Sequence, residues 1–236
     1  MPVSFLPVSG LLAGWLSACL AGRAHPEELV EALGSDALHL LTGLEDEPLS
    51  LVLALGALRS RGATGAALAL PVPGDPAGLA GPPAFNERAL DRGEAVLVIG
   101  AGLGLVPEVG DDVVTWHAAP AERPRPLDPQ EADAMLRTTL IEVTHRLVEL
   151  DVARWQPEIA DALSNLHHRL GASLPPHFAA SRAATVERAT LCREIVALAQ
   201  ESEGGAVSGF EIDARRTALA PLDRAARHAL VAACSG

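Results

Sequence analysis

A proline-rich segment divides the sequence into two parts with different hydrophobic patterns. Residues 119–130 (APAERPRPLDPQ) include four prolines. Proline lacks the backbone N–H that helix interiors and central strands need, so this segment is predicted to be stiff and extended. Apolar runs with strand character precede it, whereas only helical periodicity follows it. We therefore predict an α/β portion over residues 1–120 and a helical portion over residues 128–236, either as two domains or as one.

Three apolar runs in the first part are typical of buried strands. They are residues 63–72, 94–102 and 111–118. Residues 36–43 (DALHLLTG) fit either a strand or a helix, because the run is too short for its periodicity to decide. Apolar residues at helical spacing predict helices within residues 12–20, 26–34 and 47–62. The expected fold class is α/β, or α+β, with a small mixed sheet of three to four strands and flanking helices.

The second part is predicted to be a group of about four helices packed against the sheet portion. Asp128, Pro129 and Glu131 stand in the order of an N-cap, a first-turn proline and a first-turn acid. Apolar stripes at helical spacing follow, and glycine or proline interrupts them. The predicted helices cover residues 128–150, 157–171, 181–205 and 221–234, with a short helical stretch from Ser208 before the last.

Two missing residue types exclude several classes of enzyme. The 236 residues include no lysine and no tyrosine. A chain without lysine has no P-loop lysine, no Schiff base for pyridoxal phosphate and no lysine-dependent aldolase chemistry. Without tyrosine, the Tyr–Lys acid–base pair of short-chain dehydrogenases is excluded as well. No cofactor is predicted.

The charge of the chain argues against nucleic acid as a partner. The formal net charge is −12, and acidic residues outnumber arginines in both parts. A protein that binds a duplex needs a cationic surface that displaces counterions. The densest basic cluster is Arg215, Arg216, Arg224 and Arg227, interrupted by acids, and we interpret it as the solvated face of a helix.

Glycines after the run 94–102 raise the question of a dinucleotide site. Gly100 and Gly102 match the first two glycines of G-x-G-x-x-G, but Leu105 stands in place of the third. Pro107 and Gly110 leave no room for the helix whose N-terminus would receive a pyrophosphate. We interpret these glycines as a bend between two strands.

The cysteine and histidine spacing predicts no metal site and no disulfide framework. Cys19, Cys192 and Cys234 form no C-x-x-C pair and suit a reducing compartment, each as a small apolar residue on a helix. Glu142 and His145 form a single E-x-x-H step, whereas a di-metal site in a helical bundle needs two such steps.

The apolar N-terminal run leaves two cellular locations open. Residues 5–22 are long enough to suggest export, and residues 16–19 (LSAC) are similar to a lipobox whose Cys19 would carry a lipid. Against export, no basic residue precedes the run, and Pro7 and Gly14 interrupt it. We predict a core helix in a cytoplasmic protein with no membrane contact. The alternative is a lipoprotein anchored at Cys19.

One loop supplies the candidate binding residues. Residues 74–88 include Asp75, Asn86 and Arg88, and His117 at the end of a predicted strand could lie near them. Long ordered loops often carry function, so these four residues are the candidates for binding a ligand, and none is predicted to be catalytic. The interpretation that we favour for the loop is a rigid structural crossover in which Asn86 caps a short helix.

The segment around this loop carries a family resemblance. Residues 68–109 resemble a segment that recurs in uncharacterised proteins of high-GC actinobacterial genomes. Residues 150–155 (LDVARW) and 214–234 share the likeness more weakly. The resemblance implies no activity and no site residues.

Two hypotheses for the function follow. The first is a non-catalytic cytoplasmic interaction or scaffold protein, which binds a protein partner or itself through an exposed apolar groove on its helices. The alternative is a small-molecule-binding protein or enzyme that uses loop 74–88, with Asp75, Asn86, Arg88 and His117 converging on one pocket.

Overall fold

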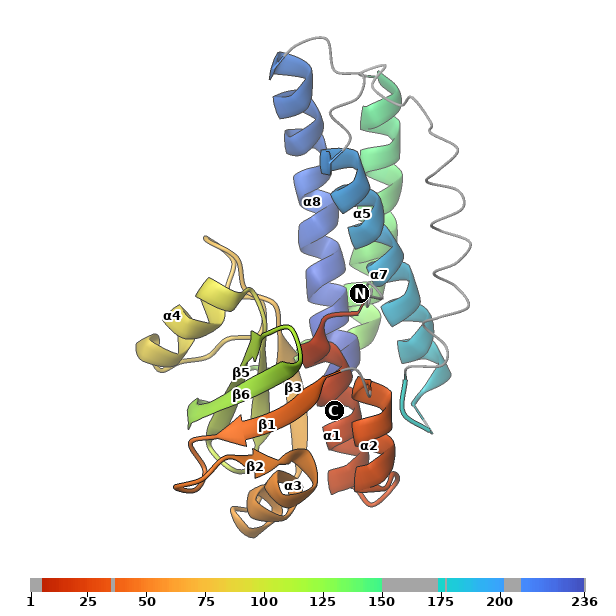
Figure 1. The fold of residues 1–236 in the computed structure, drawn as a ribbon. Coiled ribbons are helices and arrows are strands. Elements are labelled where there is room, and N and C mark those ends of the chain that lie inside the picture. Colours follow the sequence, from red (N-terminus) through yellow and green to blue (C-terminus); the bar gives the residue numbers. More distant parts are fainter. Residues whose placement is uncertain (1–5, 35–36, 150–173, 177, 202–208, 236) are drawn as a thin grey trace.

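The computed structural model describes residues 6–34, 37–149, 174–176, 178–201 and 209–235. In this part of the chain, seven helices accompany a six-stranded mixed sheet, and three long helices extend from one side of the sheet portion (Figure 1). The α/β class and the mixed sheet are confirmed. The sheet is larger than the three to four strands predicted, and the predicted helix over residues 157–171 lies outside the described residues.

The sheet combines one parallel pair of strands with four antiparallel pairs. Its strands are β1 (Leu38–Thr42), β2 (Leu49–Ser50), β3 (Gly65–Ala69), β4 (Ala95–Ile99), β5 (Leu103–Val109) and β6 (Val113–Pro120). Their order is β2-β1-β6-β5-β4-β3, and β1 runs parallel to β6 with Leu41 opposite Trp116. The described helices are α1 (Val8–Leu20), α2 (Pro26–Leu33), α3 (Leu51–Ser60), α4 (Pro83–Arg92), α5 (Pro129–Glu149), α7 (Ala180–Glu201) and α8 (Gly209–Cys234).

The strand β5 was not predicted, because its glycine and proline indicated a bend. Gly104 lies in β5 because the ring of Phe85 occupies the space that a side chain would fill. Pro107 pairs with Trp116 of β6, and the pairing of β5 with β4 ends at Leu105, so the proline breaks no ladder on its other side. Residues 103–109 therefore form a strand directly after the glycine turn, where a dinucleotide site would require a helix.

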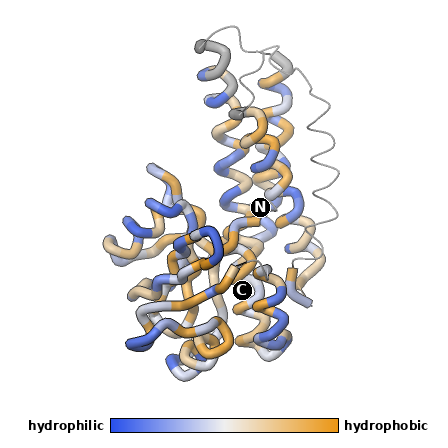
Figure 2. Tube along the Cα trace, viewed as in Figure 1, coloured by the Kyte–Doolittle hydropathy of each residue, from blue (hydrophilic) through white to orange (hydrophobic). Residues whose placement is uncertain are grey.

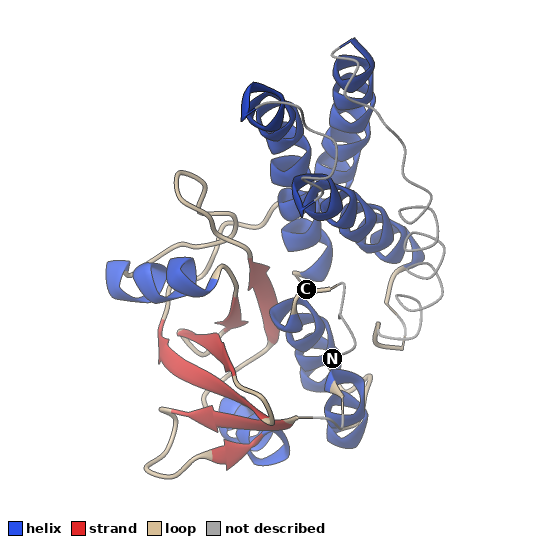
Figure 3. Cartoon of the chain, turned by 45° about the horizontal axis from the view of Figure 1, so that its top comes forward, coloured by secondary structure: helices blue, strands red, loops and turns tan. Residues whose placement is uncertain are grey.

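Both faces of the sheet are covered near β3 and β4. Leu68 and Val96 face the larger core with α1 and α3, whereas Ala67 and Leu97 face a smaller core around Phe85 of α4. Figure 3 shows the sheet between α4 on one side and α1 on the other. Burial on both sides explains why these two strands read as continuous apolar runs.

Two serines cover the open edge of β3. The Ser17 hydroxyl of α1 accepts a hydrogen bond from Ala66 N (2.9 Å) and lies 3.2 Å from Ala66 O, to which it donates. The Ser235 hydroxyl, just after α8, accepts one from Leu68 N (3.2 Å). An edge strand with unpaired backbone groups is a template for aggregation, so these hydroxyls both satisfy and protect it.

The helix α8 is the centre of the helical portion. It packs along both α5 and α7, and its C-terminal end also contacts β3 and α1. Hydrophobic and hydrophilic residues alternate along the three long helices (Figure 2). The predicted cap of α5 is confirmed, because Asp128 Oδ1 accepts hydrogen bonds from Gln130 N (2.8 Å) and Glu131 N (2.9 Å).

The predicted start of a last helix at Pro221 was wrong, because α8 runs without interruption from Gly209 to Cys234. A proline inside a helix removes one hydrogen bond and crowds the preceding turn. Pro221 and Thr217, four residues earlier, are both exposed, so water can satisfy the freed carbonyl. The burial of Leu219, Leu222 and Ala226 around the proline holds the helix together.

The three cysteines are buried and unpaired. Burial raises the pKa of Cys192 to about 11 and that of Cys234 to about 12, so both thiols stay protonated near neutral pH. Cys19 lies within α1 and its thiol donates to His25 O (3.5 Å). Among the described helices, none combines the length and apolar character that crossing a bilayer requires.

We expect Gly104→Ala to destabilise the protein and Gly56→Ala to leave it unchanged or stabilise it. A methyl group at Gly104 would overlap with the ring of Phe85, and overpacking of this kind costs about 1–3 kcal/mol. Gly56 lies in α3 with open space around it, where alanine is the better helix former by about 1 kcal/mol. Urea denaturation of both variants measures the difference. Equal free energies of unfolding would contradict the account of β5.

Candidate functional site

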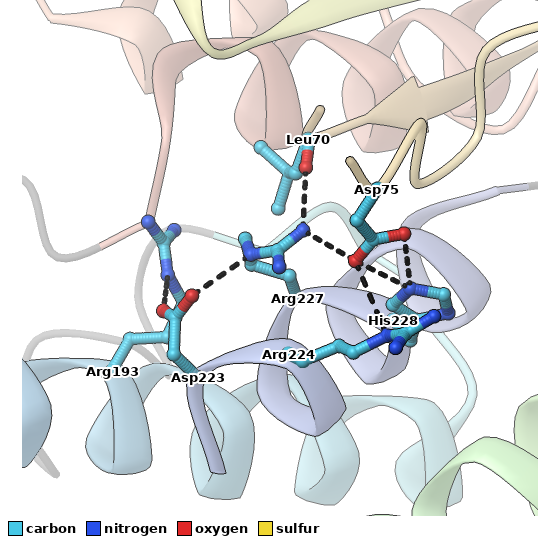
Figure 4. A network of polar contacts seen from close by, with 7 residues as sticks. All are labelled: Leu70, Asp75, Arg193, Asp223, Arg224, Arg227 and His228. Carbon is cyan, nitrogen blue, oxygen red and sulfur yellow. Dashed lines mark hydrogen bonds and ion pairs between the residues drawn. The ribbon is translucent and has the colours of Figure 1, made fainter. Parts of the chain in front are cut away.

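A tight turn directs Asp75 toward the helical portion. In residues 72–75 (VPGD), Val72 N donates to Asp75 O (3.0 Å) and Asp75 N donates to Val72 O (2.9 Å). Pro73 and Gly74, with φ of 83° at the glycine, occupy the central positions where a type II turn places proline and glycine. The turn extends beyond β3 and carries the Asp75 side chain toward α8 (Figure 4).

Three basic side chains of α8 surround the Asp75 carboxylate. His228 Nε2 lies 3.0 Å from both carboxylate oxygens, and Arg227 Nη1 lies 3.0 Å from Oδ2. Arg224 Nε is 3.6 Å from the same Oδ2. Residues at spacing i, i+3 and i+4 share one face of a helix, so α8 presents all three to the turn at once. We call these four side chains the Asp75 network.

Arg227 links this network to the backbone of the sheet portion. Its side chain is only 5% exposed, and Nη1 also donates to Leu70 O (3.1 Å). Its Nε donates to Asp223 Oδ2 (2.9 Å), and Arg193 of α7 lies 3.6 Å from the other oxygen of Asp223. The interpretation of Arg227 as part of a solvated helix face was therefore wrong. Its partner Asp75 is remote in sequence, so the pattern of the helix alone could not reveal the pair.

The surroundings of Asp75 favour its charged form. Burial, the largest single effect, raises the pKa of this carboxyl, but hydrogen bonds and charges from His228 and Arg227 together outweigh it. The pKa of Asp75 is therefore below its ordinary value of 3.8. The carboxylate stays ionised at neutral pH and holds the basic side chains in place.

The other three predicted binding residues lie elsewhere. Asn86 and Arg88 are on α4, which begins at Pro83, so the interpretation of Asn86 as a helix cap was wrong. His117 on β6 is paired with Thr42 Oγ1 (3.2 Å) and with Glu108 Oε2 (2.9 Å). Among the described contacts, the structure brings Asp75 to α8 and brings none of the other three to it.

A groove of about 460 Å³ lies between α5 and α8, beside the Asp75 network. We call it the α5–α8 groove. Its lining residues are Leu127, Asp128, Glu131, Ala132, Met135, Thr139, Pro221, Arg224, Ala225 and His228. Asp128 and Glu131 stand at the start of α5, whereas Arg224 and His228 stand on α8 and contact Asp75. The groove thus has an apolar middle, an acidic contribution from α5 and a basic one from α8.

Sequence reasoning identified Asp75 but missed Arg227 and His228. The available signal was the R-x-x-R-H spacing of Arg224, Arg227 and His228 within a helix rich in alanine and leucine. No group of three or more His, Cys, Asp or Glu side chains in the described part of the chain is arranged to hold a metal ion. The arrangement suits binding of an apolar group flanked by charges of both signs.

We expect Asp75→Asn to destabilise the protein at pH 7 by about 1–3 kcal/mol, because buried Arg227 then keeps only Asp223 as an anionic partner. Because the folded-state pKa of Asp75 is lowered, its carboxylate stabilises the fold at every pH above its ordinary pKa. That contribution is lost as the pH falls through the lowered folded value. Urea denaturation from pH 7 downward should therefore show the difference between wild type and variant shrinking below about pH 4.

The exposed Asp91 of α4 provides the matched control. Asp91→Asn should change the free energy of unfolding by less than about 0.5 kcal/mol at any of these pH values. A pH-independent loss in the Asp75 variant would show that its charge is not what stabilises the fold.

Comparison with known proteins places this chain in a family. Residues 9–132 match the Rv1486c-like protein N-terminal domain, and residues 130–231 match the Rv1486c-like protein C-terminal domain. Two relatives, the uncharacterized proteins Rv1486c and MT1533 from two strains of Mycobacterium tuberculosis, are each 37% identical over 123 residues. That alignment covers 41% of this chain and 42% of each relative, so the chain spans less than half their length. No solved structure matches. The resemblance to uncharacterised actinobacterial proteins is confirmed, and the chain belongs to the Rv1486c-like protein family.

Proposed function

We propose that this protein is a non-catalytic interaction protein and that the α5–α8 groove binds a segment of a protein partner. The observation that carries the proposal is the position of Met135, whose side chain is 58% exposed while it lines an apolar groove between two helices. Leu127, which is 36% exposed, lines the same groove, and exposed apolar side chains grouped in a groove are typical of a binding surface. Methionine suits this role because its flexible thioether adapts to different partners.

The shape and lining of the groove favour a helical segment as the occupant. Ala132, Pro221 and Ala225 are small or flat side chains that leave room between α5 and α8. Such a groove accepts apolar side chains that recur at i and i+3 or i+4 on a partner helix. Glu131 on one wall and Arg224 on the other would pair with opposite charges of the partner and set its orientation.

Asp75 serves this site as a positioning residue. Its buried carboxylate contacts Arg224 and His228, which both line the groove. A basic wall that is fixed before binding loses less side-chain entropy when the partner arrives. Asp75, which the sequence had singled out in loop 74–88, therefore supports the groove through its contacts with Arg224 and His228.

A small molecule is the second candidate occupant of this groove. The volume of about 460 Å³ is within the range of small-molecule sites, and Arg224 and His228, which line it, contact Asp75 of loop 74–88. This form of the alternative hypothesis retains Asp75 and drops Asn86, Arg88 and His117 from the site.

The cytoplasmic location and the boundary between the two portions stay predictions.

Site-specific photocrosslinking in the native host tests the proposal. We expect a benzophenone amino acid at position 135 to form one discrete protein adduct, because that side chain lies in the groove. The same probe at Ile141, which is 59% exposed on the same helix but does not line the groove, should form none. An adduct at twice the chain mass of 24.5 kDa would identify a second copy as the partner.

The variant Arg224→Glu provides the second test of the same surface. Reversing this exposed charge should abolish the adduct at position 135 if the groove recognises its partner through both walls. Equal crosslinking from positions 135 and 141, or an adduct that survives the charge reversal, would refute binding in the groove.

A further inference from the structure

A second cavity, of about 480 Å³, lies beneath the proline-rich segment. We call it the strap cavity, after residues 123–129, which form one of its walls. The opposite walls come from β3, the end of β4, the start of α7 and the C-terminal end of α8. Its remaining lining residues are Ala67, Leu68, Gly78, Ile99, Arg182, Val231 and Ser235.

Three arginines line this cavity in a protein whose net charge is −12. Arg123 and Arg125 are exposed, and neither forms an ion pair with any described residue. Arg182 donates from Nη2 to the uncharged backbone oxygen of Ser235 (2.7 Å), and it forms no ion pair with another described residue. The guanidinium groups therefore make the cavity locally cationic.

Among the described lining residues, the one acid, Asp128, offsets only one of these charges. Asp128 Oδ1 is hydrogen-bonded to the backbone of Gln130 (2.8 Å) and Glu131 (2.9 Å) at the start of α5. A carboxylate at that position interacts with the positive end of the helix dipole. Asp128 is thus held at the start of α5, and the described lining keeps more positive than negative charge.

The rest of the lining is apolar and rigid. Leu68, Ile99 and Val231 supply aliphatic walls, and the first and last of these belong to the main hydrophobic core. Pro124 and Pro126 flank Arg125 and restrict the backbone that carries it. Ser235 is fixed by hydrogen bonds from Leu68 N (3.2 Å) and to Val231 O (2.6 Å). These constraints hold the cavity open in one shape before any ligand arrives.

We infer that the strap cavity binds a small molecule that carries a phosphate or carboxylate group on an apolar body. Planar guanidinium groups form paired hydrogen bonds with both kinds of oxyanion. The aliphatic walls contact the apolar body, and the volume is within the range of small-molecule sites. Leu127 and Asp128 line both this cavity and the α5–α8 groove, but the three arginines line this cavity and not the groove, so the inference does not rest on the proposed partner site.

Isothermal titration calorimetry at low salt tests the inference with three probes of similar size. Phenyl phosphate and benzoate are anionic, whereas benzyl alcohol is neutral. We expect at least one anion to bind and the alcohol not to bind. The anion that binds more tightly shows whether the cavity prefers a phosphate or a carboxylate group. The double variant Arg123→Gln/Arg125→Gln should weaken that binding by at least about tenfold, because charge-assisted hydrogen bonds are lost at exposed positions that the fold does not need.

Two control variants complete the experiment. Arg88→Gln removes an exposed arginine of α4 outside the cavity and should leave anion binding unchanged. Met135→Glu changes the α5–α8 groove alone and should also leave it unchanged, which separates this site from the proposed partner site. The inference is overturned if neither anion binds, if benzyl alcohol binds as tightly, or if Arg88→Gln weakens binding as much as the double variant.

Discussion

The contact between Asp75 and Arg227 joins the sheet portion to the helical portion. Both side chains are buried, at 9% and 5% exposure, and each compensates part of the charge of the other, alongside Asp223 for Arg227 and His228 for Asp75. Arg227 also donates to Leu70 O beyond the end of β3, which ties α8 to the backbone of the sheet as well as to the loop. The contact thus fixes the position of α8 along β3, and the positions of α5 and α7 follow because both pack against α8.

The sequence predicted β3 and β4, whose neighbours on both faces are apolar, as well as the partly buried β6, and it failed where one neighbour compensates for an unfavourable residue. Leu68 and Val96 lie in strands that read as continuous apolar runs, and both were recognised. Gly104 disfavours a strand by itself and is accepted in β5 because Phe85, from a helix 19 positions earlier, fills its place. Pro221 in α8 is tolerated for a similar reason, since packing on both sides of it outweighs the lost hydrogen bond.

The candidate site was predictable only in part, because its two halves are remote in the sequence. Asp75 was singled out as a member of a loop rich in glycine and proline, and the structure places it at the end of a tight turn. The other half is an ordinary basic stretch in the sequence: Arg224, Arg227 and His228. Only the structure shows that the turn brings Asp75 into contact with these side chains. His117 was selected for its position at a strand end, yet Glu108 of the neighbouring strand already pairs with it. The spacing of residues within one helix or strand can be read from the sequence, whereas the pairing of residues from different helices and strands depends on the fold.

A single stripe of α8 connects both cavities with the Asp75 network. Arg224 and His228 line the α5–α8 groove, and Val231 and Ser235 continue the same helical stripe into the strap cavity. Arg227 adjoins this stripe and is held by Asp75 and by Leu70 O. The edge of β3 depends on the same stripe, because Ser235 satisfies Leu68 N. A shift of α8 along its axis would therefore disturb the groove, the ion pairs and the sheet edge together.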